Sequence, residues 1–171
     1  RRQRQMCKET GVNWSAYGNE YGRTSFFLAQ SYKFNKDESF TEAEDQTGNL
    51  TDYVGRIYAA PSPYLDLNYR FKLDKNDYDI NFSELSANIG PSILNGYVSY
   101  IYFPANSASS LDYKQERKEL FTALNVKLTR NWSASIYNRQ DLAENGGSLE
   151  HGGTLTYEDE CAVFAIQMRQ D

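Results

Sequence analysis

Histidine, cysteine and proline are all scarce in this chain of 171 residues, which contains one His, two Cys and four Pro. With His151 as the single histidine, the sequence argues against a His-based zinc site and against a Ser–His–Asp triad. Cys7 and Cys161 lie near opposite ends of the chain; they are too few for a disulfide scaffold and lack the spacing of a metal site. We therefore expect a protein that is not an enzyme, with no catalytic residues, no cofactor and no metal.

Positive charge and long apolar runs are also lacking. The chain has 18 basic and 23 acidic residues and a net charge of −5, whereas nucleic-acid binders show a basic surplus, so we expect no nucleic-acid partner. No run approaches the ~18 consecutive apolar residues of a membrane-spanning helix. Arg1, Arg2 and Arg4 precede no apolar core and do not resemble a secretory signal. We expect the chain to be soluble, or a mature piece of an exported protein, or a fragment.

Alternation of apolar and polar residues is what the sequence has in abundance. It is clearest over residues 64–74, where every second residue is apolar and its neighbours are polar. A period of two predicts a strand with one apolar and one polar face. The apolar row of this strand is Leu65, Leu67, Tyr69, Phe71 and Leu73, and its polar row is Asp66, Asn68, Arg70 and Lys72.

The same alternation recurs between turn-like breaks and divides the chain into about ten strand segments, most of them longer than the usual ~5–6 residues. We predict an all-β fold, an antiparallel meander of about ten long strands. The segments are 11–18, 23–35, 52–60, 64–75, 78–89, 93–103, 116–130, 132–142, 151–160 and 161–170.

Three segments are less simple than the rest. After Phe82 the apolar phase slips by one residue to Leu85, which indicates a bulge or a bend. Residues 94–103 are aromatic on both parities, so their facing stays open. Residues 116–128 have leucines four apart, which fits a helix as well as a strand, and the flanking strands favour a strand.

Alternation does not say which face of the strands meets water. A soluble sandwich buries the apolar face, whereas an outer-membrane barrel turns it toward lipid and keeps a polar lumen. The barrel is favoured by the length of the strands, by charged residues in mid-strand and by tyrosines near strand ends, where they suit the headgroup region. We therefore interpret the apolar row as lipid-facing and the polar row as lumen-facing.

Several short motifs follow one another in a specific order. Thr51-Asp52-Tyr53-Val54-Gly55-Arg56 precedes Tyr69-Arg70-Phe71-Lys72-Leu73-Asp74-Lys75, and Leu155-Thr156-Tyr157-Glu158-Asp159-Glu160-Cys161 comes much later. Residues 30–34 and 132–142 also fit. Together, over roughly residues 12–171, these motifs resemble the C-terminal half of the barrel of the lipopolysaccharide-assembly family LptD, also called OstA. The resemblance implies that residues 11–171 are the C-terminal portion of a transmembrane β-barrel and that residues 1–10 are a divergent or unrelated flank.

The resemblance also implies a function and partners. LptD forms a large barrel in the Gram-negative cell outer membrane, and this chain would be a segment of it, incomplete on its own. The barrel is the translocon that inserts lipopolysaccharide into the outer leaflet. The implied partners are lipopolysaccharide, the plug lipoprotein LptE, outer-membrane lipid, and periplasmic lipopolysaccharide bridge proteins that act through an N-terminal domain absent from this sequence.

The two cysteines differ in what the resemblance implies for them. On the residues alone, Cys161 is best taken as a free, partly buried thiol. The family pattern instead implies that Cys161 forms a disulfide with an N-terminal partner outside this sequence, in an oxidising compartment. Cys7 has no counterpart in that pattern.

Other polar groups have interpretations of their own. Glu158, Asp159 and Glu160 fit a polar strand end better than a catalytic carboxylate pair, because alternation points Asp159 away from its neighbours. His151 beside two glycines predicts a turn. Basic residues on the polar faces could bind lipopolysaccharide phosphates or pair with Asp66 and Asp74. These basic residues are Arg56, Arg70, Lys72, Lys127 and Arg139.

Two other functions stay open at this point. One is a different outer-membrane barrel, such as a porin-like channel, which requires a closed strand set from this chain alone. The other is a soluble all-β binding module with an apolar interior.

The long connections 36–49 and 104–113 are the candidates for extracellular loops, and the even number of strands between them places both on one side.

Overall fold

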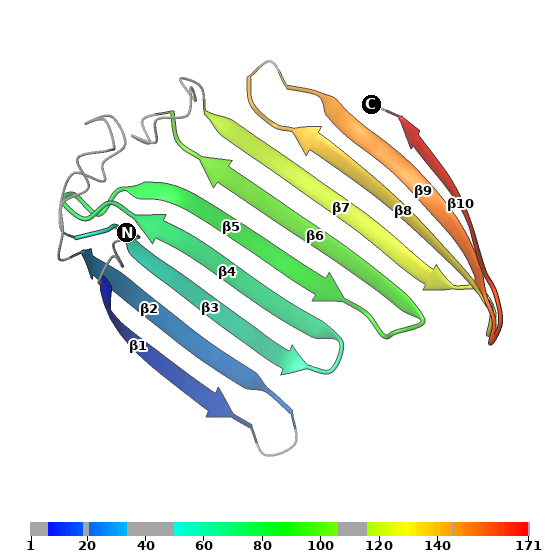
Figure 1. Cartoon of the computed structure of the whole chain (residues 1–171), viewed down its shortest axis with the longest axis horizontal. Helices are drawn as coiled ribbons and strands as arrows, with labels where there is room; N and C mark the ends of the chain where they lie inside the picture. Colours follow the sequence, from blue (N-terminus) through cyan, green and yellow to red (C-terminus); the bar gives the residue numbers. More distant parts are fainter. Residues whose placement is uncertain (1–6, 19–20, 34–49, 106–115, 145, 171) are drawn as a thin grey trace, which may run out of the picture.

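A computed structural model describes residues 7–18, 21–33, 50–105, 116–144 and 146–170 of the chain. These residues form one ten-stranded sheet in which each strand pairs antiparallel with its neighbours in sequence. Figure 1 shows the meander running from β1 at one edge to β10 at the other. The predicted all-β antiparallel meander is therefore confirmed. The strands are β1 (Cys7–Tyr17), β2 (Arg23–Lys33), β3 (Tyr53–Ser62), β4 (Leu65–Leu73), β5 (Ile80–Ile89), β6 (Leu94–Phe103), β7 (Arg117–Lys127), β8 (Trp132–Asp141), β9 (Ser148–Glu158) and β10 (Val163–Gln170).

The sheet is open. Within the described part of the chain, β1 pairs only with β2 and β10 pairs only with β9, so the two outer strands leave unpaired edges. This arrangement is that of a partial barrel, and the described strands do not make the closed ring that the porin-like interpretation requires. In the same residues, no helix is long and apolar enough to cross a membrane.

The two ends of the sheet carry different connections. At one end, the short-turn end, the chain reverses within residues 18–22, 63–64, 90–93, 128–131 and 159–162. At the other, the long-connection end, the strands are joined through 34–52, 74–79, 104–116 and 142–147. Both long connections predicted from the sequence leave the sheet at this second end, as the even strand count predicts, although most of their residues lie outside the described ranges.

Register assigns each strand residue to one of two faces, because directly paired residues of antiparallel strands lie on the same side. Leu67, Tyr69 and Phe71 pair with Ala59, Ile57 and Gly55 of β3 and with Ala87, Leu85 and Ser83 of β5. Extending these pairs across the sheet defines an apolar face and a polar face. Beyond the apolar row, the apolar face carries Val12, Trp14, Phe26, Leu28, Val98, Leu120, Leu124, Ile136, Leu155 and Ile166.

The predicted slip in phase is a β-bulge at Asn81. Leu73 pairs with Ile80 and Lys72 pairs with Phe82, so Asn81 is the extra residue on its strand. A bulge of one residue switches the face of everything beyond it. This is why Ile80 and Leu85 share the apolar face although their sequence parities differ, while Phe82 joins the polar face.

The register also settles the other segments left open by the sequence. Residues 117–127 form strand β7 and not a helix. In β6, Val98 and Tyr100 lie on the apolar face because they pair with Thr122 and Leu120. β1 begins at Cys7, earlier than the predicted residue 11.

The turn predicted at His151 is wrong, because His151 lies inside β9 and pairs with Asn138. The glycines that suggested a turn are strand residues that give room to their neighbours. A Cβ on Gly152 would lie 2.9 Å from the hydroxyl oxygen of Tyr137 and 2.5 Å from the backbone oxygen of Met168. Gly152 therefore serves close packing within the sheet, as glycine in a strand interior often does.

Candidate functional site

The polar face is the more enclosed of the two faces. The described polar residues with the smallest exposed fractions are Ser99 at 4% and Glu119 at 5%, with Glu84 and Ser86 close behind. All four belong to the polar face, whereas Ile136 on the apolar face is 59% exposed. Soluble domains show the reverse distribution, with apolar side chains inside and charged ones outside.

Ion pairs link neighbouring strands across the polar face. Arg70 of β4 pairs with Glu84 of β5, and Glu84 also accepts a hydrogen bond of 3.4 Å from the hydroxyl of Ser99 on β6. Near the long-connection end, Lys72 Nζ lies 2.8 Å from a carboxylate oxygen of Asp52. A buried carboxylate is tolerated when such partners satisfy it.

A second cluster joins β7, β8 and β9. Glu119 pairs with Arg117 on its own strand and with Arg139 on β8, whose Nη2 and Nε lie 2.6 and 2.9 Å from the same carboxylate oxygen. On β9, Glu150 accepts a hydrogen bond of 2.7 Å from the Tyr137 hydroxyl and lies 3.2 Å from Arg169 Nε. The polar face therefore carries two groups of polar contacts, one on β4–β6 and one on β7–β10.

The carboxylate partners are not those considered from the sequence. Asp66 accepts a hydrogen bond of 2.6 Å from the Tyr58 hydroxyl. Asp74 lies in the turn after β4, where the backbone N–H of Asn76 donates to its carboxylate and lowers the pKa of that carboxyl. Glu84 and Glu119, which do form the buried pairs, were missed because their facing depends on the bulge and on the register of β6. Glu84 has the sequence parity of the polar row and Glu119 has the opposite parity, so parity alone could not place both residues on that face.

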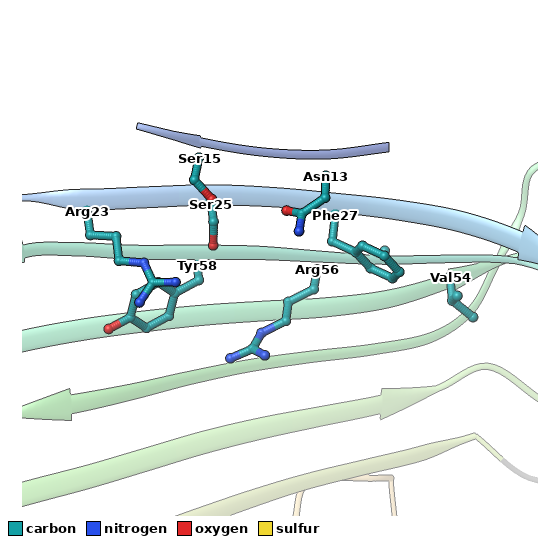
Figure 2. Close-up of a pocket in the computed structure, with 9 residues that line it drawn as sticks. Asn13, Ser15, Arg23, Ser25, Phe27, Val54, Arg56 and Tyr58 are labelled. Atoms are coloured by element: carbon teal, nitrogen blue, oxygen red, sulfur yellow. The ribbon is translucent and has the colours of Figure 1, made fainter. Parts of the chain in front are cut away.

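The polar face is also hollowed over β1, β2 and β3. The hollow has a volume of about 740 Å³ and contains Arg23, Arg56 and Tyr58 together with small polar residues. Figure 2 shows these side chains projecting to the same side of the three strands. We call it the β1–β3 hollow; its other lining residues are Asn13, Ser15, Ser25, Phe27, Val54 and Gly55.

The apolar face has aromatic clusters at both ends. At the short-turn end, the rings of Trp132 and Tyr157 lie 5.2 Å apart, and at the long-connection end those of Tyr53 and Tyr78 stack at 5.7 Å. In the described strands, the charged residues of this face are Lys8 and Lys118, both near the long-connection end. Between the clusters, the face is an uncovered band that is mainly apolar.

The predicted residues of β4 separate as the alternation requires. The apolar row lies on the apolar face and the polar row lies on the polar face. Neither row forms a compact pocket of its own; each contributes one strand's share to a face that spans the sheet.

Cys161 lies in the turn between β9 and β10, at the short-turn end, and is a free, exposed thiol. In the same turn, the carboxylate of Asp159 accepts hydrogen bonds from the backbone N–H groups of Cys161 at 2.9 Å and Ala162 at 2.8 Å, which lower the pKa of Asp159. Asp159 of the acidic run therefore caps the turn between β9 and β10. The described residues also contain no group of three His, Cys, Asp or Glu side chains that could hold a metal.

Comparison with known proteins gives one family. The family model described as LPS transport system D, LptD, matches residues 9–132, from β1 to the start of β8. No curated protein and no solved structure matches the chain. The matched residues make up more than two thirds of the sequence, and the family is one of transport proteins and not of enzymes. The chain therefore belongs to the LptD family, whose members take part in lipopolysaccharide transport to the outer membrane.

Proposed function

We propose that this chain is part of the outer-membrane translocon that inserts lipopolysaccharide into the outer leaflet. On this proposal, residues 11–171 are the C-terminal portion of its transmembrane barrel, and residues 1–10, whose last four begin β1, are a divergent flank. The observation that carries the proposal is the contrast between the two faces of one sheet: an uncovered apolar band and a hydrogen-bonded, ion-paired polar surface.

Lipid is the solvent that suits this arrangement. Burial stabilises a protein by roughly 25 cal/mol for each Å² of apolar surface removed from water, and apolar side chains exposed to water do not gain this stabilisation. An acyl-chain environment removes that cost for the apolar band and requires the backbone groups to be paired, as they are within the ladders. On this proposal, Leu65, Leu67, Tyr69, Phe71 and Leu73 face lipid. Asp66, Asn68, Arg70 and Lys72 face the lumen.

A polar lumen wall explains how such a sheet serves transport. The sugars and phosphates of lipopolysaccharide remain hydrated or hydrogen-bonded along the polar face, while the acyl chains stay with lipid. On this proposal, the chain forms part of the barrel wall and has no catalytic role. The plug lipoprotein LptE would fill part of the lumen, and the periplasmic bridge proteins would deliver lipopolysaccharide through the N-terminal domain.

The two ends of the sheet suggest an orientation. Outer-membrane barrels have short periplasmic turns and longer extracellular loops. The short-turn end, with Cys161, is therefore proposed to face the periplasm, and the long-connection end to face the cell exterior. A periplasmic Cys161 is also where a disulfide to an N-terminal partner would form.

The function is tested by depleting the full-length protein in its own host. We expect newly made lipopolysaccharide to stop reaching the cell surface, measured by its modification by an outer-leaflet acyltransferase, while assembly of an unrelated porin continues at first. Surface arrival of lipopolysaccharide that persists after full depletion would contradict the proposal. The porin-like alternative predicts instead that depletion changes solute permeability without affecting lipopolysaccharide.

A further inference from the structure

Two arginines on the polar face differ from the rest. Arg70, Arg117, Arg139 and Arg169 each pair with a carboxylate. Arg23 and Arg56 have other contacts among the described residues. Arg56 Nε donates a hydrogen bond of 2.6 Å to the side-chain oxygen of Asn68, and Arg23 contacts aromatic rings. Both therefore bring positive charge to the polar face with no described carboxylate within ion-pair distance.

The two guanidinium groups are held beside one tyrosine. Their central carbons lie 5.7 Å (Arg23) and 5.9 Å (Arg56) from the ring centroid of Tyr58. Figure 2 shows the three side chains on the same side of the strands. Cation–π contacts of this kind fix a guanidinium without neutralising its charge. Asp66 also lies on this face, and its carboxylate accepts a hydrogen bond of 2.6 Å from the Tyr58 hydroxyl. The hollow thus presents two oriented cations.

Register adds to the positive character of this region. Arg56 is directly opposite Arg70 across β3 and β4. Like charges in this position are unfavourable unless a counter-charge is present. Glu84 forms an ion pair with Arg70, whereas Arg56 forms no ion pair with a described carboxylate and donates to the neutral side chain of Asn68. A bound anion would provide the missing counter-charge.

The remaining lining of the hollow suits a sugar. Asn13, Ser15 and Ser25 offer side-chain donors and acceptors for hydroxyl groups, and Phe27 offers a ring face for the C–H surface of a pyranose. A volume of about 740 Å³ is in the range of sites that take a small ligand. Arginine is suited to phosphate because its planar fork can donate two parallel hydrogen bonds.

We propose that the β1–β3 hollow is a binding subsite for a phosphorylated saccharide, with Arg23 and Arg56 holding the phosphate and the serine, asparagine and phenylalanine side chains holding the sugar. The inference rests on the proposed function, in which this face lines the path of a phosphorylated glycolipid. It goes beyond that function by assigning one binding site on the lipopolysaccharide path to named residues.

The test uses the full-length protein with its partner in lipid nanodiscs and three probes. The probes are an acyl-free glucosamine disaccharide bearing two phosphates, the same disaccharide without phosphate, and inorganic phosphate. We expect the phosphorylated disaccharide to bind measurably by calorimetry, and the Arg23→Gln/Arg56→Gln variant to raise its Kd about tenfold or more. The matched control is Lys127→Gln, which removes an exposed cation from the same face outside the hollow and is expected to change the Kd less than about twofold.

Three results of this binding experiment would each contradict a different part of the proposal. Equal binding of the phosphate-free disaccharide would overturn the role of the arginines. Competition by inorganic phosphate at the same concentration as the disaccharide would overturn the saccharide assignment. An unchanged Kd in the double arginine variant, with normal folding, would overturn the subsite. The transport function would still stand in that case if depletion of the protein blocks surface arrival of lipopolysaccharide.

Discussion

Glu119 holds two guanidinium groups on the polar face. Glu119 as a whole residue is 5% exposed. Its carboxylate pairs with Arg117 and Arg139, whose side chains are 36% and 40% exposed. We expect Glu119→Ala in the full-length protein to lower the free energy of unfolding by about 3 kcal/mol, because two partly enclosed cations lose their counter-charge. Denaturation in lipid vesicles measures this.

Glu9 provides the control for that prediction. It lies on the same face at the open edge and is exposed, so Glu9→Ala is expected to change stability by less than about 0.5 kcal/mol. A Glu119→Ala protein as stable as the Glu9→Ala protein would show that the charge cluster contributes nothing to the sheet.

Cys161 carries a second prediction at this scale. Its thiol is exposed in the β9–β10 turn, where a partner cysteine from the periplasmic region has access on the proposed orientation. We expect Cys161→Ser to abolish a band shift between reduced and non-reduced full-length protein on gels, and Cys7→Ser to leave that shift in place. A shift that depends on Cys7 and not on Cys161 would contradict the proposed pairing.

At the scale of the element, the turn after β9 depends on an ionised carboxyl. Backbone N–H groups of Cys161 and Ala162 lower the pKa of Asp159 below its ordinary value of 3.8. A lowered pKa stabilises the turn at pH values above 3.8, and this contribution is lost as the pH falls through the folded-state pKa. We expect the peptide spanning this turn to lose protection from hydrogen exchange as the pH falls through the folded-state pKa of Asp159. Protection is measured as the exchange rate relative to the intrinsic rate at the same pH.

Two variants isolate the ionisation from the hydrogen bonds. Asp159→Asn keeps a side-chain acceptor that does not titrate, so its protection should not depend on pH. Asp159→Ala removes the acceptor and should lack protection throughout. Equal pH dependence in the wild type and Asp159→Asn would contradict the assignment.

Strands were predictable from the sequence because alternation is a local property. The β4 rows, the strand at 117–127 and the slip before Leu85 each depend on a few consecutive residues. The pairing of Glu84 with Arg70, and of Glu119 with Arg139, depends instead on which residues of separate strands face each other. The turn wrongly predicted at His151 has the same origin, since Tyr137 and Met168 on the two neighbouring strands leave no room for a side chain at Gly152.

At the scale of the whole molecule, the question is which solvent meets each face. Ile136 and Ser135 are adjacent in β8 and lie on opposite faces, with Ile136 59% exposed. In water, replacing such an isoleucine by arginine would cost little. In a bilayer, an arginine on the lipid face costs about 2–4 kcal/mol near the midplane.

We therefore expect Ile136→Arg to destabilise the full-length protein in lipid vesicles by about 2–4 kcal/mol and Ser135→Arg by less than about 1 kcal/mol. Leu67→Arg and Asn68→Arg test the same contrast in β4, where the two residues also lie on opposite faces. Denaturant titration of all four variants gives the comparison. Arginine tolerated at Ile136 and Leu67, with loss of folding at Ser135 and Asn68, would place lipid on the wrong face. The ion pairs of Glu84 and Glu119 would then belong to an outer surface, and the polar face would not line the path proposed for lipopolysaccharide.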